Sequence, residues 1–318
     1  MLLTVVLPVR NEAAALTSFH SRLAETLAAQ LAPGDSWEAL YVDDGSTDQS
    51  VELIRGLAEN DARVRLVALT RNFGKEVATT AGLHHAAGDA IVLMDSDGQH
   101  PPEIIGEFLE AWRGGAQVVV GVRKDNRGAS ALKSAASRLF YTMSKSISGG
   151  ELLRNSTDYC LIDREAAEAF RDYRQQSRMT RAIIQSMGYQ RGTVEFSAGP
   201  RMGGEPSYST KKLVGLAVDA LVAGSRKPLV WSAAAGAGMA LAGLAGGCAV
   251  FTEQIILADP LGWKFTGSAM LGILILFITG LILCSQGIIG LYLAAVYREV
   301  LGMPLYLVNE ARSVRSRR

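Results

Sequence analysis

The first two thirds of the chain alternate between two patterns of hydrophobic positions. Short runs of β-branched and other apolar residues predict five strands, over 3–7, 39–42, 64–69, 90–94 and 117–122. Between them, apolar residues at helical spacing predict helices over 11–30, 50–59, 75–87 and 103–113. Apolar strands that alternate with helices are typical of a parallel sheet covered on both faces. We therefore expect an α/β fold with a Rossmann-like, mainly parallel sheet and helices on both of its faces.

The last third of the chain has long apolar runs instead. No charged residue occurs over 228–252 or over 265–297. A helix that crosses the hydrocarbon core of a bilayer needs about 20 apolar residues, so the sequence predicts two transmembrane helices. Basic residues flank both runs, whereas the loop between them carries mainly acidic ones. The positive-inside rule then predicts a plasma-membrane (inner-membrane), multi-pass protein with both termini in the cytoplasm.

These patterns divide the chain into four expected parts. A soluble domain spans 1–208, a two-helix transmembrane hairpin spans 228–298, and a basic cytoplasmic tail spans 299–318. The segment 209–227 fits either an amphipathic helix in the membrane interface or a core helix of the soluble domain, and its position before the first span favours the interface. Gly243 and Gly247 form a GxxxG pattern, which fits a packed helix pair, and hence a homo-oligomer, as well as simple Gly/Ala richness.

Composition excludes several classes of protein. With 48% hydrophobic residues the chain is not a disordered one. The formal charge of +1 argues against nucleic-acid binding, which needs a surplus of Lys and Arg. The three cysteines form no CxxC, so neither a disulfide framework nor a zinc site is expected. His20, His84 and His85 lack the spacing of zinc ligands, and we expect structural roles for them.

Acidic side chains follow two of the expected strands. The sequence Asp43-Asp44-Gly45-Ser46 comes after the second strand, and Asp95-Ser96-Asp97-Gly98-Gln99-His100 comes after the fourth. Ligands of open parallel sheets bind at the carboxyl ends of the strands. Carboxylates there suit Mg²⁺ or Mn²⁺, or polar recognition of a sugar or base. Neither GxxxxGK[ST] nor a GxGxxG after the first strand is present, so the usual P-loop and dinucleotide motifs are missing.

Several longer motifs together carry a family resemblance. They are VVLPVRNE, YVDDGSTDQS, LTRNFGKEVATTAGL, MDSDGQHPPE, STDYCLIDR and the terminal MPLYLV. With the two apolar runs, they make the chain resemble the GT-A-fold inverting glycosyltransferases related to dolichyl-phosphate mannose synthase. It is similar in particular to the membrane-anchored bacterial polyisoprenyl-phosphate glycosyltransferases, such as bactoprenol glucosyltransferases. The resemblance implies a GT-A-type fold for the domain 1–208.

The resemblance also implies roles for individual residues. The donor pocket would contain Pro8, Asn11, Glu12, Asp44, Asp95, Gln99 and Lys75. Asp95 and Asp97 match the DxD motif, and the ligands of Mg²⁺ or Mn²⁺ would be Asp95, Asp97 and Gln99. Catalytic roles would fall to Asp158, Asp97 and Arg201. The acceptor phosphate would lie near Arg123, Lys133 and Ser137.

The chain departs from the family pattern at three places. His100 replaces the second acidic residue of DxDxQDPPE, Cys160 stands where Arg is common, and the loop after Arg201 lacks a Lys at the usual position. These departures leave open which sugar is carried.

The resulting hypothesis is a membrane-anchored inverting glycosyltransferase. It would move a sugar from a UDP- or GDP-linked donor, with UDP-glucose favoured, to a polyisoprenyl phosphate such as undecaprenyl phosphate. Its catalytic domain would face the cytoplasm. Two alternatives are a processive polysaccharide synthase and an inactive, membrane-bound scaffold that binds sugar nucleotides. The synthase would need QxxRW, whereas Gln175 begins a QQSRM sequence here. The intact DxD argues against the scaffold.

Overall fold

The computed structural model describes residues 1–124, 153, 155–176, 178–197 and 267–314, with single positions between 234 and 252. The expected juxtamembrane helix and most of the first expected membrane span lie outside the described residues. The chain divides into two compact units, Met1–Ser209 with Met303–Arg318, and Thr210–Gly302. Each unit is described by itself below.

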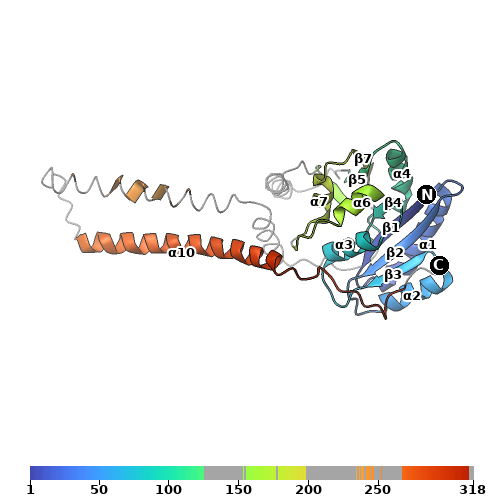
Figure 1. The fold of residues 1–318 in the computed structure, drawn as a ribbon, viewed down its shortest axis with the longest axis horizontal. Coiled ribbons are helices and arrows are strands. Elements are labelled where there is room, and N and C mark those ends of the chain that lie inside the picture. The colour runs from blue at the N-terminus through green and yellow to red at the C-terminus, as the bar shows by residue number, and fades with distance from the viewer. Residues whose placement is uncertain are drawn as a thin grey trace. The chain divides into compact units, whose positions relative to one another are not determined.

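The first unit is built on a mixed sheet (Figure 1). Its described part has seven strands in the order β3-β2-β1-β4-β6-β5-β7. They are β1 Leu2–Val9, β2 Ser36–Asp43, β3 Val64–Ala68, β4 Ala90–Leu93, β5 Val118–Arg123, β6 Ser156–Asp163 and β7 Arg191–Phe196. β6 runs antiparallel to its neighbours β4 and β5, and every other pairing is parallel. The five strands expected from the sequence are present, and β6 and β7 are additional.

Helices cover both faces of this sheet, as expected for an α/β fold. The described helices of the unit are α1 Ala13–Gln30, α2 Ser50–Asn60, α3 Lys75–His85, the 3-10 helix η1 Pro102–Ile104, α4 Ile105–Arg113, α6 Arg164–Phe170 and α7 Thr180–Ser186. Side chains of β1 alternate between two cores because successive residues of a strand point to opposite faces. Val5 packs with α1, α2 and α4, whereas Val6 packs with α3, α6 and α7.

The helix α3 lies close against the sheet at Gly82. A Cβ atom at this position would come within 2.2 Å of the Val6 Cγ1 atom, so only glycine fits without a shift. The same helix begins at Lys75, directly after the loop that follows β3. The tight contact at Gly82 therefore fixes the helix that carries Lys75.

The antiparallel direction of β6 matters for the position of its residues. The carboxyl ends of the parallel strands all lie at one edge of the sheet. Because β6 runs the other way, its amino end lies at that same edge. Asp158, the third residue of β6, is thereby brought to the edge where parallel sheets bind ligands.

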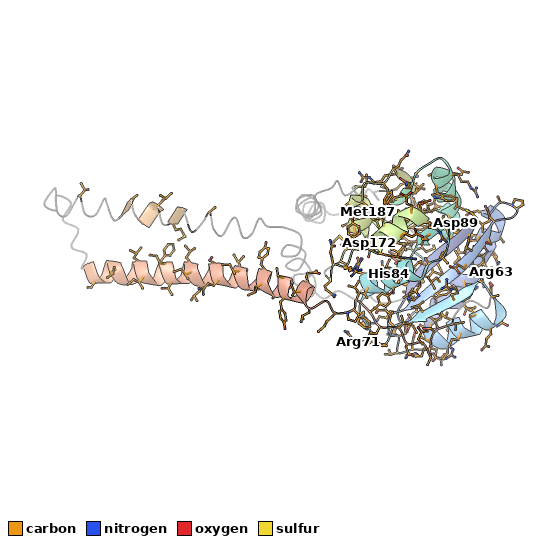
Figure 2. The ribbon with its side chains drawn as sticks, viewed as in Figure 1. Arg63, Arg71, His84, Asp89, Asp172 and Met187 are labelled. Atoms are coloured by element: carbon orange, nitrogen blue, oxygen red, sulfur yellow. The ribbon has the colours of Figure 1, made fainter. Side chains whose placement is uncertain are left out.

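Residues 303–314, here called the C-terminal strap, pack on β3 and α3. The strap forms antiparallel bridges from Val314 to Leu66 and from Val308 to Leu69. The Tyr306 hydroxyl lies 3.2 Å from Nδ1 of His84 on α3, whose side chain is labelled in Figure 2. The expected tail thus includes a segment that covers the free edge of the sheet.

The second unit contains the long helix α10, Gly267–Val300. Its window Phe277–Ala294 has a mean hydropathy of 1.8, and no part of that window is buried. Among the described residues, this one helix is long and apolar enough to cross a membrane. It corresponds to the second apolar run of the sequence.

Candidate active site

Two carboxylates face each other where β4 and β6 meet the ligand-binding edge. The β4–β6 ladder pairs Leu93 with Cys160. Continued by two residues in the same register, it sets Asp95 opposite Asp158. Like charges in such positions repel each other, so this arrangement needs a compensating cation.

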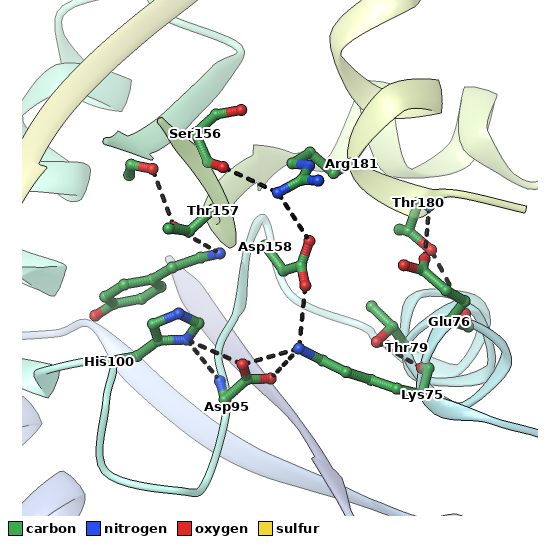
Figure 3. Close-up of polar contacts among 12 residues, drawn as sticks. Lys75, Glu76, Thr79, Asp95, His100, Ser156, Thr157, Asp158, Thr180 and Arg181 are labelled. Atoms are coloured by element: carbon green, nitrogen blue, oxygen red, sulfur yellow. Dashed lines mark hydrogen bonds and ion pairs between the residues drawn. The ribbon is translucent and has the colours of Figure 1, made fainter. Parts of the chain in front are cut away.

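Lys75 supplies that cation (Figure 3). Its Nζ atom donates to Oδ2 of Asp95 at 2.8 Å and to Oδ2 of Asp158 at 3.0 Å. On the other side of Asp158, the Arg181 guanidinium lies 3.9 Å from Oδ1 and also donates to the backbone oxygen of Ser156 at 2.9 Å. Three elements, α3, β6 and α7, therefore hold the two carboxylates together.

This network keeps Lys75 and Asp158 charged. Burial opposes ionisation of Asp158, but Lys75 and Arg181 outweigh it and lower the pKa of the Asp158 carboxyl. Burial likewise opposes the charge on Lys75, yet Asp95 and Asp158 outweigh it and raise the pKa of the ammonium group. Near neutral pH, Asp158 is therefore an anion and Lys75 a cation, so neither group is ready to exchange a proton.

A small pocket lies beside Lys75 and Asp158. It is lined by Lys75, Glu76, Thr79, Leu93, Asp158, Cys160, Thr180, Arg181 and Ile184. Glu76 accepts a hydrogen bond from the backbone amide of Thr180 at 2.7 Å, and burial together with the charge of Asp158 raises the pKa of the Glu76 carboxyl. Glu76, Thr180 and Arg181 were not identified from the sequence; no local motif marks the helix α7, which carries Thr180 and Arg181.

The residues 95–100, here called the metal loop because they contain the expected metal ligands, follow β4 in a compact turn. The Gln99 amide donates to Oδ1 of Asp97 at 3.0 Å. The Ser96 hydroxyl donates to the backbone oxygen of Pro8 at 3.2 Å and contacts the Glu12 carboxylate. At the start of the loop, the Asp95 amide donates to Nδ1 of His100 at 2.9 Å. Pro8 and Glu12 therefore support the loop from the end of β1.

Asp44 follows β2 and joins the loop after this strand to the loop that precedes α3. Its carboxylate accepts hydrogen bonds from the backbone amides of Phe73 at 2.7 Å and Gly74 at 2.9 Å. Burial raises the pKa of Asp44, and the two amides partly oppose this. The next residue, Gly45, has φ of 67°, and a Cβ there would come within 2.5 Å of the Asn72 nitrogen. Glycine is therefore required for the close approach of these loops.

Asn11 connects this region to the end of β1. Its Oδ1 atom accepts from the Thr47 amide at 2.8 Å, and its own amide donates to Oγ of Ser46 at 3.0 Å. Asn11 has φ of 54°, a left-handed conformation that asparagine tolerates better than most residues. Pro8 at the end of β1 and Asn11, Glu12 and Asp44 on the following loops, which the family resemblance assigns to a donor pocket, thus belong to segments joined by hydrogen bonds.

The residues expected near the acceptor phosphate are described only in part. Arg123 is an exposed residue at the carboxyl end of β5, and its amide donates to the Asn155 oxygen at 3.0 Å. Lys133, Ser137 and Arg201 lie outside the described residues. The structure therefore brings together Lys75, Asp95 and Asp158, with Asp97 and Gln99 on the adjoining loop.

The donor chemistry of the metal loop fits a hard divalent cation. Asp95 and Asp97 offer carboxylate oxygens, the ligands that Mg²⁺ and Mn²⁺ prefer. Over the described stretches of the chain, no three His, Cys, Asp or Glu side chains form a metal-binding group. Mg²⁺ is commonly held by one or two carboxylates, with substrate phosphates and water as its other ligands. Two aspartates therefore suit a metal that binds together with a diphosphate.

The histidines expected to be structural lie away from this loop. His20 is buried in the core, and its Nδ1 atom lies 3.0 Å from the Tyr41 hydroxyl. His84 contacts Tyr306 of the strap, and the His85 ring packs 6.2 Å from the ring of the same tyrosine.

Comparison with known proteins relates the chain to glycosyltransferases along nearly its whole length. An uncharacterized glycosyltransferase of Bacillus subtilis, YkcC, is 31% identical over 99% of this chain and 95% of its own. The uncharacterized glycosyltransferase sll0501 of Synechocystis is 33% identical over 97% of this chain and 95% of its own. The bactoprenol glucosyl transferase of Shigella phage SfII is 31% identical over 98% of each chain.

A solved structure and a family match complete the comparison. The mannosyltransferase PcManGT of Pyrobaculum calidifontis, in complex with GDP-Man and Mn²⁺, has a TM-score of 0.46 and 20% identity, over 95% of this chain and 88% of its own. Glycosyl transferase family 2 matches residues 4–171. This match and the full-length relatives show that the chain belongs to glycosyl transferase family 2.

Proposed function

We propose that the chain is a membrane-anchored inverting enzyme that transfers a sugar from a nucleotide sugar to a polyisoprenyl phosphate. The observation that carries this proposal is the pair of Asp95 and Asp158 joined by Lys75 at the ligand-binding edge of the sheet. Relatives named bactoprenol glucosyl transferases support a lipid-linked acceptor. The apolar helix α10 supports a position at the membrane, where such an acceptor resides.

The donor is a UDP- or GDP-linked sugar, with UDP-glucose favoured. Its nucleotide binds over Pro8, Asn11, Glu12 and Asp44, which lie on segments that support one another. The diphosphate then extends toward the metal loop. We assign Gln99, on that loop, and Lys75 to the diphosphate side of the donor pocket.

Asp95, Asp97 and Gln99 would hold Mg²⁺ or Mn²⁺, which would offset negative charge on the diphosphate and make it a better leaving group. Lys75 contacts Asp95 and adds a second positive charge to the same region. Arg201, on the segment that follows β7, is proposed to add a third. Together these charges favour departure of the nucleoside diphosphate.

The acceptor phosphate attacks the anomeric carbon of the sugar. A new bond forms between the phosphate oxygen and this carbon, while the bond from the carbon to the diphosphate oxygen breaks, with inversion. A phosphate monoester has a second pKa of about 6, so its oxygen is already anionic near pH 7. Asp158 therefore acts by orienting groups through Lys75 and Arg181 and does not need to remove a proton. Arg123, Lys133 and Ser137 are proposed to hold the acceptor phosphate in line.

Sugar transfer by the full-length chain in nanodiscs tests the proposal. Polyisoprenyl phosphate is supplied with a panel of radiolabelled UDP- and GDP-sugars, with Mg²⁺ or Mn²⁺ and with EDTA. A lipid-linked monosaccharide that disappears with EDTA is the expected product. Formation of a polymer would instead indicate a processive synthase. Binding of donors without any turnover would indicate a scaffold, and either outcome would overturn the proposal.

A further inference from the structure

We propose that His100 is a positioning residue that holds the start of the metal loop through its Nδ1 atom, while its ring packs on Tyr159 of β6. This inference rests on the proposed function for its consequence in metal binding. The hydrogen bond itself, from the Asp95 amide to His100 Nδ1, measures 2.9 Å and spans the metal loop (Figure 3). It closes residues 95–100 into a turn that starts at one proposed metal ligand, Asp95, and contains another, Asp97.

The bond requires a specific state of the imidazole. A backbone amide can only donate, so Nδ1 must present its lone pair and the ring proton must lie on Nε2. The Asp95 carboxylate lies 3.8 Å from the same nitrogen, beyond hydrogen-bond distance. His100 therefore holds the main chain of Asp95 and leaves its carboxylate to Lys75.

Aromatic contacts fix the imidazole itself. Its ring stacks on Tyr159 of β6, with centroids 4.7 Å apart and planes inclined by 18°. The Phe196 ring of β7 contacts its edge at 5.8 Å and 80°. The Tyr159 hydroxyl also donates to the oxygen of Pro101, the residue after His100, at 2.8 Å. His100 is 6% exposed, so few other orientations are open to the ring.

These contacts connect the position of Asp95 to that of Asp158. Tyr159 directly follows Asp158 on β6, and successive residues of a strand point to opposite faces. Asp158 contacts Lys75, while Tyr159 supports His100. A movement of β6 would therefore move both Asp158 and the start of the metal loop. His100 thus keeps Asp95 and Asp158 at a fixed separation, which in-line transfer requires.

A neutral acceptor at position 100 also suits the charge of the loop. An aspartate could accept the same amide but would add a negative charge beside Asp95. The neutral acceptor holds the loop without that charge. The positioning role therefore depends on the acceptor atom, whereas a purely structural role would depend on the ring.

Three full-length variants in nanodiscs separate these roles. His100→Asn keeps an acceptor near the position of Nδ1 but loses the ring. His100→Leu has nearly the shape of asparagine but lacks the acceptor. His100→Phe keeps a ring for Tyr159 and Phe196 but also lacks the acceptor. Thermal unfolding of each variant establishes that it is folded.

The first measurement is hydrogen–deuterium exchange of the metal loop in the absence of metal and donor. Loss of the acceptor is expected to speed exchange of the Asp95 amide about fivefold in the Leu and Phe variants, with little change in Asn. The second is Mn²⁺ affinity in the presence of UDP, followed by electron paramagnetic resonance. It is expected to fall about tenfold in Leu and Phe and to stay near wild type in Asn.

The two measurements also distinguish this inference from the proposed function. Wild-type exchange and Mn²⁺ affinity in the Phe variant would overturn the positioning role. Equal impairment of Asn and Leu would do the same, because the ring would then be what matters. If the wild-type chain binds no Mn²⁺ and transfers no sugar, the proposed function fails. In that case hydrogen–deuterium exchange without metal still decides whether His100 holds the loop. If His100→Phe does not fold, the comparison of His100→Asn with His100→Leu decides the same question.

Discussion

Asp95, which follows β4, and Asp158, which lies on the antiparallel strand β6, are joined by the ammonium group of Lys75. The parallel strand β4 ends just before Asp95, whereas the antiparallel strand β6 has just begun at Asp158. Two carboxylates in such positions repel each other unless a cation lies between them. Lys75 fills that place, so the charge balance of the site can be changed with one substitution.

Lys75→Met should make the fold more dependent on divalent cations. Without the ammonium group, the repulsion between Asp95 and Asp158 is uncompensated, and the melting temperature measured in EDTA should fall. A bound ion stabilises the state that binds it, so Mn²⁺ should raise the melting temperature more in the variant than in wild type. Lys124→Met removes an exposed lysine and is the control. An equal Mn²⁺ response in both variants would contradict the role of Lys75.

Asp97→Asn should abolish metal-dependent transfer without unfolding the chain. The substitution keeps the size of the side chain and an oxygen for the Gln99 amide, but removes the charge offered to the metal. We expect transfer to fall about 100-fold or more and Mn²⁺ affinity to fall with it. Glu107→Gln removes an exposed carboxylate of α4 and should be neutral in the same radiolabel assay. Undiminished transfer by Asp97→Asn would remove the proposed metal site.

The pH dependence of transfer should follow the acceptor and not Asp158. Lys75 and Arg181 lower the pKa of Asp158, so this carboxyl stays ionised across the neutral range. Transfer should therefore rise with pH through about 6, where the phosphate monoester loses its second proton. Asp158→Asn should lower kcat while the acidic limb of the kcat profile stays in place. A limb that shifts or disappears in the variant would indicate that Asp158 removes a proton.

His84 should make the stability of the first unit depend on pH. Burial, followed by the charges of Arg178 and Arg171, lowers the pKa of His84 to about 4. The unfolded chain binds a proton there below about 6.5, so stability should fall between about pH 6.5 and 4 and stay level above. Glutamine does not titrate, so His84→Gln should lose less stability than wild type between pH 7.5 and 5.0, as measured by thermal unfolding. Parallel losses in both proteins would contradict the assignment.

Strands β1 to β5 could be predicted because each contains a short apolar run. The same search missed β6, which begins with the polar residues Ser156, Thr157 and Asp158. It also missed β7, although Val194 and Phe196 are buried while Thr193 and Glu195 are exposed. This period of two was a usable signal for an edge strand.

The candidate site was predictable only where its residues follow strands. Asp44, Asp95 and Asp97 were identified by their positions after apolar runs. Asp158 was identified through a family motif, but its place opposite Asp95 depends on the antiparallel direction of β6, which local sequence does not specify. Arg181 reaches the site from α7 through tertiary packing alone.

The C-terminal strap changes how the chain should be divided. Because Met303–Arg318 belongs to the same compact unit as the sheet, the stretch Thr210–Gly302 is an insertion within that unit and not an appendage at its end. A protein truncated before this insertion would lose the pairing partners of Leu66 and Leu69 and expose a bare strand edge, which invites self-association. A water-soluble version of the enzyme should therefore be made by removing Thr210–Gly302 and joining the two remaining segments of the chain.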